Sequence, residues 1–387
     1  MATHRMNRFE LSSERRTKQE AERIPHMGST RINRIGWKMA LAALSSLFMA
    51  LPVAAAAQDH QPAFKVLSPI VRGNLAVFPV VADRSYDTAQ FITLDEGIRA
   101  GQVTVTEAGD ELGLVRPGQA IPRRQQGAEV NRLVLYNNSP HALLLLAGEI
   151  VTGGKQDRVI GSDHIVPPNT GPIDLGVFCV EPERWVASSD KFGSMGAQMA
   201  QPSVRTPAMA ERNQSQVWAN VRAADAKMAS SLGGAEAAAV PQTSSYAKVF
   251  ESAPVAKRVA SYGGAESELA ILRELRGKGA LGVVVAINGR VLWADLFANT
   301  ELLAKYWPKL MRSYVAEAIT SGDSGPAADL HDAQLYVDSL NGGREIVETE
   351  ANVYRRTDVT GEGYRVFELV SLLPKTGFTV HITKIRQ

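Results

Sequence analysis

Short apolar runs separated by turn residues dominate residues 58–187 and indicate β-strands. One run spans residues 75–81, and Pro79 favours an edge position for it, because proline donates no ladder hydrogen bond. Thr93 and Glu96 have the spacing of a capping box and predict the start of a short helix. Gly153-Gly154 predicts a hairpin turn with positive φ. We therefore expect a β-rich N-terminal part with short hairpins.

Residues 188–278 instead show helical spacing in a stretch rich in Ala, Ser, Gly, Gln and Met. Thr206-Pro207 predicts a helix start, with Thr as the cap and Pro at the first helical position. Val217, Val221, Ala224 and Met228 share one predicted helix face. Residues 235–245 are typical of a linker or flap. The middle segment is predicted to be helical and partly mobile.

Residues 279–387 combine both patterns. Asn288-Gly289 between two apolar runs predicts a hairpin with a type I′ turn. A helix is expected from Thr300, with a kink or restart at Pro308. Three further strands are expected at 345–355, 364–372 and 378–385. The fold class is therefore predicted to be α+β, with β-rich N- and C-terminal parts.

The N-terminal segment has the order of regions found in a secretory signal. Arg31, Arg34 and Lys38 precede an apolar run at 39–51, and Ala54–Ala57 provide the small residues of a cleavage site. Cleavage is expected after Ala57, and an uncleaved anchor is the alternative. Met27 would open a more typical signal peptide, so we expect translation to start there.

This pattern predicts three parts and a periplasmic or secreted location. They are a signal peptide at 1–57, a domain at 58–320 with a loose helical insertion at about 190–265, and a C-terminal β-strand extension at 321–387 packed on it. No later apolar run is long enough to span a membrane, so we expect no span after signal cleavage.

Charge and cysteine content narrow the function classes. Of 42 Lys+Arg and 40 Asp+Glu in 387 residues, nine and four lie in residues 1–57, so the remainder carries a net charge of −3. A mildly acidic body does not favour nucleic acid as a partner. Cys179 is the one cysteine, so no intramolecular disulfide forms and stability depends on packing.

Local motifs for metal or phosphate chemistry are missing from the sequence. No two of the seven histidines have the spacing of helical metal ligands, so no metal site is predicted. Residues 148–155 resemble a phosphate-binding loop, but an extra Gly displaces Lys155 and Gln156 replaces the Ser or Thr that would hold Mg²⁺. The cofactor, if there is one, is not identified.

Charged residues are dense between positions 143 and 185. Alternation along 155–160 would place Lys155 and Asp157 on one face and Gln156 and Arg158 on the other. Buried charges are costly unless they pair or bind a ligand. The ligand-binding candidates are Lys155, Gln156, Arg158, Glu181, Arg184 and Trp185, and we expect them to lie together with Glu149 and Asp157.

Three residues are candidates for catalysis, although none is assigned. Glu149 and Asp157 would act as acid or base, and Cys179 would act as a nucleophile if a nearby cation lowered its thiol pKa. The alternative for Cys179 is a small buried hydrophobe within an apolar strand. Trp185 would either stack on a ligand or cap the core.

Several segments together resemble one bacterial domain family. They include Leu145-Leu-Ala-Gly-Glu149, Gly153-Gly-Lys-Gln-Asp-Arg158, Cys179-Val-Glu-Pro-Glu-Arg-Trp185 and the 283–317 segment. Over roughly residues 64–319 the chain resembles the ARG and Rhodanese-Phosphatase-superfamily-associated Protein domain. The family is uncharacterised and brings no catalytic residues, but its name suggests a role near ADP-ribose or nucleotide metabolism.

Two functions stay open at this point. One is a non-enzymatic structural or interaction module of the cell envelope, with an unknown protein partner at the helical segment. The other is a binder or enzyme acting on an anionic small molecule, such as a nucleotide or ADP-ribose derivative. The first requires Lys155, Arg158, Glu181 and Arg184 to pair in a filled interior, and the second requires them to converge on a concave pocket.

Overall fold

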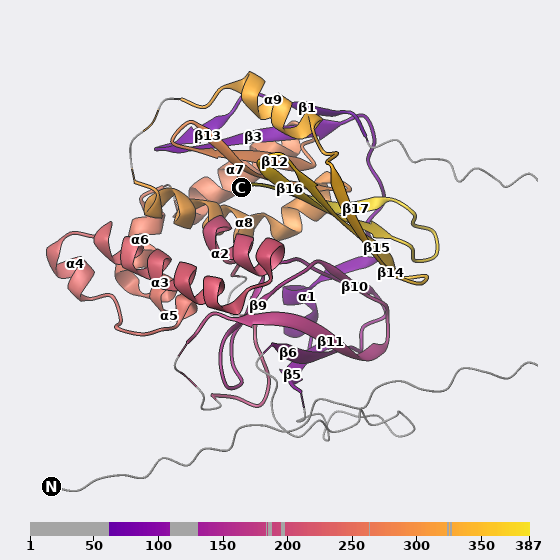
Figure 1. Cartoon of the computed structure of the whole chain (residues 1–387), viewed down its shortest axis with the longest axis horizontal. Helices are drawn as coiled ribbons and strands as arrows, with labels where there is room; N and C mark the ends of the chain where they lie inside the picture. Colours follow the sequence, from indigo (N-terminus) through magenta and orange to yellow (C-terminus); the bar gives the residue numbers. More distant parts are fainter. Residues whose placement is uncertain are drawn as a thin grey trace, which may run out of the picture. The chain divides into compact units, whose positions relative to one another are not determined.

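Both ends of the chain contribute strands to one large antiparallel sheet (Figure 1). The computed structural model describes residues 62–108, 131–182, 184, 188–194, 198–262, 264–322, 325 and 327–387. Within these residues the sheet has nine strands in the order β1-β3-β12-β13-β17-β16-β15-β14, and β2 pairs with β3. The strands are β1 (Phe64–Val66), β2 (Ile70–Arg72), β3 (Leu75–Ala82), β12 (Gly282–Ile287), β13 (Arg290–Phe297), β14 (Arg344–Glu350), β15 (Tyr354–Gly361), β16 (Tyr364–Ser371) and β17 (Thr379–Arg386).

Helices cover both faces of this sheet, which explains why the central strand β12 is apolar along its whole length. On β12, Val283 and Val285 belong to the core cluster of α7 (Gly264–Gly277) and α8 (Thr300–Thr320). Val284 and Ala286 belong to the core cluster of α9 (Leu330–Asp338) on the opposite face. Figure 1 shows α9 above the sheet and α8 below it.

Two smaller sheets hold the segments that carry most candidate residues. One has the order β10 (His164–Val166), β7 (Ala142–Leu145), β4 (Phe91–Thr93), and the other β5 (Val103–Glu107), β6 (Arg132–Asn137), β11 (Thr170–Cys179), β9 (Arg158–Ile160), β8 (Ile150–Val151). The predicted capping box opens α1 (Leu94–Arg99), where Thr93 and Glu96 each accept a hydrogen bond from the other's backbone N–H.

The middle segment is helical, and the α+β fold class is confirmed. The predicted face of α3 (Gln214–Ser230), with Val217 and Val221, is buried. The other helices are α2 (Pro202–Thr206), the π-helix η2 (Pro207–Glu211), α4 (Gly234–Ala238), α5 (Tyr246–Glu251) and α6 (Ala253–Ala260). No residue of α4 is buried, and the mobility of this stretch stays a prediction.

The predicted hairpin at Asn288-Gly289 is confirmed. Asn288 has φ 52° and Gly289 has φ 76°, the two positive values that a type I′ turn requires. The turn connects β12 to β13, which pair from Ile287 opposite Arg290 to Gly282 opposite Leu296 with one register shift between Val285 and Ala286. α8 begins at the expected position, and Pro308 lies inside it without ending it.

Pro79 does not lie on an edge strand, so that prediction is wrong. β3 pairs with β12 on one side and with β1 and β2 on the other. Proline is accommodated because the partner on one side is interrupted between Val66 and Ile70, opposite Pro79. There the carbonyl of Pro79 accepts a hydrogen bond of 2.8 Å from the N–H of Leu67, and no donor is needed from the proline.

Two element boundaries also differ from the prediction. Thr206 precedes η2, which begins at Pro207 as expected, but it has helical φ and ψ, makes no capping hydrogen bond and is the last residue of α2, which begins with Pro202. The strand expected at 345–355 is two strands, β14 and β15, joined by a turn in which Asn352 has φ 60°. In both cases the predicted type of element, helix or strand, is present, but its boundary differs from the prediction.

The signal segment and residues 109–130 lie outside the described residues. Export of the chain therefore stays a prediction. Within the described part, no helix combines the length and the apolar character needed to cross a membrane.

Candidate functional site

Three of the candidate residues, Lys155, Gln156 and Asp157, lie in the connection between β8 and β9. Gly153 and Gly154 have φ values of 132° and 47°, as predicted for the turn. A Cβ at Gly154 would lie 2.3 Å from a ring carbon of Phe192, so glycine is required there. Only Arg158 of the four residues 155–158 is in a strand, and the predicted alternation along 155–157 is therefore wrong.

Asp157, Glu181 and Arg184 form one cluster. The Arg184 guanidinium lies 3.3 Å from Asp157 and 2.6 Å from Glu181, and it also donates to the carbonyl of Gly154. Ser245 Oγ donates to the second oxygen of Asp157 at 3.0 Å. The carboxylates are buried and their oxygens face this chain's own donors. The cluster connects the β8–β9 turn to the start of α5.

Arg158 and Lys155 meet a different carboxylate, that of Glu107 on β5. Arg158 is fully buried, and its guanidinium lies 3.7 Å from Glu107. The backbone N–H of Lys155 donates to the same Glu107 oxygen at 2.8 Å. The Gln156 amide donates to the carbonyl of Glu181 at 3.0 Å. Arg158 and Gln156 therefore face the interior and present no open surface to a ligand.

Burial raises the pKa of Asp157, and the nearby charge of Glu181 raises it further. A raised carboxyl pKa is a property of many acid catalysts, but Asp157 is only 4% exposed. Its oxygens are occupied by Gly153 N–H, Ser245 and Arg184. The shift follows from burial in a structural cluster.

Cys179 is buried at the end of β11. Burial raises the pKa of its thiol to about 11, against the opposing effect of Arg158. The thiol therefore stays protonated at neutral pH, and the proposed nucleophile lacks the property it needs. Trp185 lies outside the described residues.

Glu149 does not join the cluster, although it is in the neighbouring strand segment. Its carboxylate accepts a hydrogen bond of 2.6 Å from Lys309 of α8, and the other oxygen accepts one from Leu146 N–H. Lys309 also pairs with Asp95 of α1. Burial would lower the pKa of Lys309, but the two carboxylates outweigh it and raise that pKa. The predicted patch thus splits into three paired groups.

A fourth buried network was missed by sequence reasoning. Asp295 on β13 is fully buried and accepts hydrogen bonds from Trp293 Nε1 at 2.9 Å, from Thr383 Oγ1 at 2.9 Å and from Tyr314. Arg205 lies 3.3 Å from the same carboxylate. No spacing in the sequence connects these residues, which come from four separate elements.

His381 connects this network to Asp163. Its Nδ1 lies 2.6 Å from Asp163, and its Nε2 lies 3.3 Å from Asp295. Burial would lower the pKa of His381, but the two carboxylates outweigh it and raise the pKa to about 9. His381 is therefore charged at neutral pH and holds β17 against β13 and the segment before β10.

A hollow of about 200 Å³ borders Asp163 and is lined by three arginines, Arg212, Arg356 and Arg365. The carboxylate of Glu348 pairs with Arg356 and lies 3.8 Å from Arg212. Asp358 pairs with Arg365. Each guanidinium therefore has an internal partner, and the hollow carries no surplus of positive charge for an anion.

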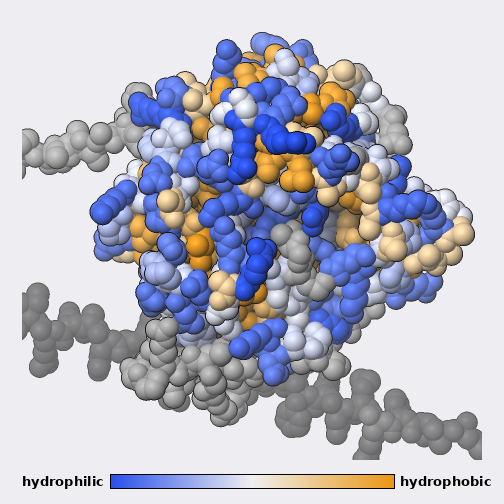
Figure 2. Space-filling model, turned by 180° about the vertical axis from the view of Figure 1, so that it is seen from behind, coloured by the Kyte–Doolittle hydropathy of each residue, from blue (hydrophilic) through white to orange (hydrophobic). Residues whose placement is uncertain are grey.

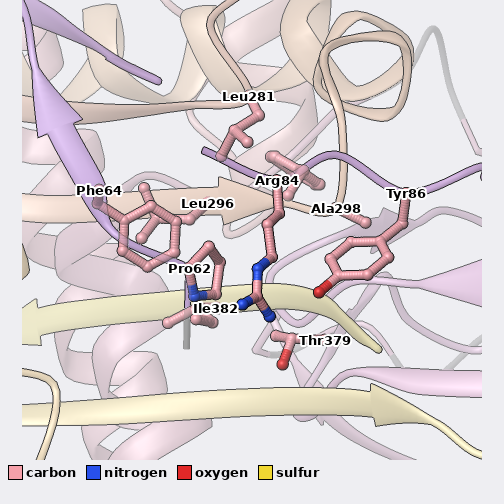
Figure 3. Close-up of a pocket in the computed structure, with 10 residues that line it drawn as sticks. Pro62, Phe64, Arg84, Tyr86, Leu281, Leu296, Ala298, Thr379 and Ile382 are labelled. Atoms are coloured by element: carbon pink, nitrogen blue, oxygen red, sulfur yellow. The ribbon is translucent and has the colours of Figure 1, made fainter. Parts of the chain in front are cut away.

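The cavity of Figure 3 is too small to be a ligand site. It lies where β1, β13 and β17 meet, and the Arg84 side chain extends across it between Phe64 and Tyr86. Its volume is about 20 Å³, which is space for about one water molecule.

A groove of about 630 Å³ between α5, α6, α7 and α8 has the size and the lining of a ligand site. Figure 2 shows several hydrophobic patches surrounded by hydrophilic side chains, so exposed apolar surface alone does not single out a site. The groove is distinguished by its volume together with a mainly apolar lining contributed by four helices. Its apolar lining includes Met199, Phe250, Val259, Tyr262, Met311 and Val315.

Among the described residues, no three His, Cys, Asp or Glu side chains are grouped so that they could hold a metal ion. The polar groups that line the groove are a glutamine, two glutamates and an arginine, together with two tyrosine side chains. The lining could therefore bury the apolar part of a ligand and pair its charged groups with the glutamates or the arginine.

Comparisons with known proteins agree with the resemblance found in the sequence. Neither curated proteins nor solved structures yield a match. A protein-family match covers residues 63–384, which runs past Ile319 and includes the C-terminal strands β14–β16 and most of β17. The chain therefore belongs to the family of the ARG and Rhodanese-Phosphatase-superfamily-associated Protein domain.

Proposed function

We propose that this protein is a non-enzymatic binding module of the cell envelope, which holds a small, mainly apolar molecule in the groove between α5, α6, α7 and α8. The signal pattern at residues 31–57 supports the envelope location. The groove supports binding, because clefts of 300–1,000 Å³ with apolar lining are typical of ligand sites.

The contrast between the groove and the charged segments is the observation that carries this proposal. Arg158, Glu181 and Asp157 are buried and bonded within the chain, as expected of a scaffold. The groove instead presents a mainly apolar lining around a space of about 630 Å³. Burying such surface releases about 25 cal/mol per Å².

The alternative, binding or catalysis on an anionic small molecule at the 149–184 segments, has less support. It needs Arg158 and Arg184 to clamp the anion, but Arg158 is fully buried and Arg184 faces two carboxylates. An added anion would have to displace Asp157 or Glu181 from Arg184. The family name alone favours this alternative.

Binding of the neutral dye Nile red tests the proposal. Ala256 on α6 is exposed and lines the groove, so Ala256→Trp would fill the space without disturbing the core. Ala253→Trp is the matched control, because Ala253 is exposed on the same helix and does not line the groove. We expect saturable fluorescence enhancement in the wild type and the control, and its loss in Ala256→Trp. Equal binding by both variants would refute the groove as the site.

Export is tested separately by mass spectrometry of periplasmic protein. An N-terminus near Gln58 is expected. Mature material that still contains the apolar run at 39–51 would contradict the location but leave the groove unaffected.

A further inference from the structure

The charges around the groove indicate which kind of apolar molecule it binds. Its lining contains Glu251, Glu268 and Arg312 as the charged side chains, a formal net charge of −1. An anionic amphiphile would therefore meet two carboxylates and one guanidinium. The two carboxylates, Glu268 and Glu251, differ in their burial and in their partners within the chain.

Glu268 on α7 is the better buried carboxylate, with a side chain 12% exposed. Its partner Arg312 is 51% exposed, and Arg312 Nε lies 3.5 Å from Glu268 Oε2. Burial raises the pKa of Glu268 in spite of that guanidinium. Water screens this half-exposed ion pair, so a second cation beside Glu268 would add to the stabilisation of its negative charge.

Glu251, at the end of α5, is exposed at the groove and forms no ion pair with another described residue. The amide of Gln198 donates to Glu251 Oε1 at 3.0 Å. Partial burial and the like charge of Asp157 raise the pKa of Glu251. A cation bound beside Glu251 would stabilise its charged form, against both the partial burial and the repulsion from Asp157.

We propose that the groove selects amphiphiles with an apolar chain and one protonated amine, whose ammonium group binds at Glu251 and Glu268. This inference rests on the proposed binding function and specifies its ligand class. The chain would lie against Met199, Phe250 and Val315, and the ammonium would donate charge-assisted hydrogen bonds to the carboxylates. Desolvation of the groove on binding strengthens these bonds.

The test uses three probes with the same octyl chain: octylammonium, 1-octanol and octyl sulfate. Each competes with Nile red for the wild-type protein at pH 7 and low salt. We expect octylammonium to bind about 10-fold more tightly than 1-octanol, since a hydrogen bond to a charged group contributes about 1.5 kcal/mol or more. Octyl sulfate is expected to bind most weakly.

Two charge-removing variants locate the effect. Glu268→Gln should weaken octylammonium binding about 10-fold, and Glu251→Gln about 3-fold because it is exposed. Neither variant should change 1-octanol binding. Glu266→Gln is the control, because Glu266 is exposed on α7, does not line the groove, and changes the net charge equally.

The outcomes separate this inference from the function it rests on. Equal affinities for octylammonium and 1-octanol, or a preference that survives both variants, would overturn the charge selection while dye binding still supports the groove. Tightest binding of octyl sulfate would overturn it as well. If Nile red and all three probes fail to bind, the proposed function itself is wrong.

Discussion

The charge on His381 makes the stability of the protein depend on pH above neutrality. The pKa of His381 is about 9 in the folded protein, against an ordinary value of 6.5. A raised folded pKa means that the stabilisation is complete below 6.5 and is lost as the pH rises through 9. At 1.36 kcal/mol per pKa unit, the full contribution is about 3 kcal/mol.

Lys384 and Asp225 also change the pH dependence of stability, so the effect of His381 can be measured only in a limited pH range. Burial lowers the pKa of Lys384 to about 8, so the unfolded chain binds more protons above pH 8 and stability then rises with pH. Burial raises the pKa of Asp225 to about 7, so its contribution changes mainly below that pH. Between pH 7 and 8 the effects of Lys384 and Asp225 are opposite in sign, so His381 should dominate, with a loss of about 1.2 kcal/mol.

Urea unfolding at several values between pH 7 and 8 measures this slope. His381→Asn should remove it and lower stability at pH 7 by about 3–5 kcal/mol, because Asp163 and Asp295 lose a buried partner. If the variant does not fold, NMR titration of the His381 ring proton in the wild type gives the pKa directly. A midpoint near 6.5, or a flat slope in the wild type, would refute the reasoning.

Three further predictions concern the buried side chains of Lys309, Cys179 and Arg158. Lys309→Met should destabilise the protein by about 3–5 kcal/mol in urea, because the buried Glu149 is left unpaired, whereas Lys305→Met, which breaks an exposed pair, should change stability by about 1 kcal/mol or less. Cys179 should react with a thiol reagent at pH 8 only in the unfolded chain, and labelling of the folded protein would show that the thiol is accessible. Arg158→Ala should cost about 3–5 kcal/mol and leave Nile red binding unchanged, and an Arg158→Ala variant of unchanged stability would contradict the scaffold role and restore the anion-site alternative.

Local geometry accounts for what the sequence could predict. The turn at Asn288-Gly289 and the capping box at Thr93 each depend on residues within a few positions, and their signals survive packing. The face of α3 with Val217 follows in the same way from helical spacing. The burial of Cys179 was one of two readings, because an apolar strand is compatible with both a buried and an active thiol.

The charged networks could not be predicted, because their partners are distant in the chain. Glu149 and Lys309 are 160 positions apart, and Asp163 and His381 are 218 positions apart. Sequence proximity instead suggested that Glu149 joins the 155–184 patch. Neighbouring strand residues point to opposite sides, so nearness along the chain does not decide which carboxylate meets which cation.

The groove could not be predicted from the sequence either, because it depends on how helices of small residues pack. The abundance of Ala and Gly between 188 and 278 predicts a loose segment, and this segment forms helices of which α3 and α7 bury one face. Ala256, Ala260 and Ala265 line the groove, and their short side chains cannot fill the space between α6, α7 and α8. Helices of larger residues would close that space by interdigitation, as protein interiors do. The small side chains of these three alanines are therefore what keeps the groove open.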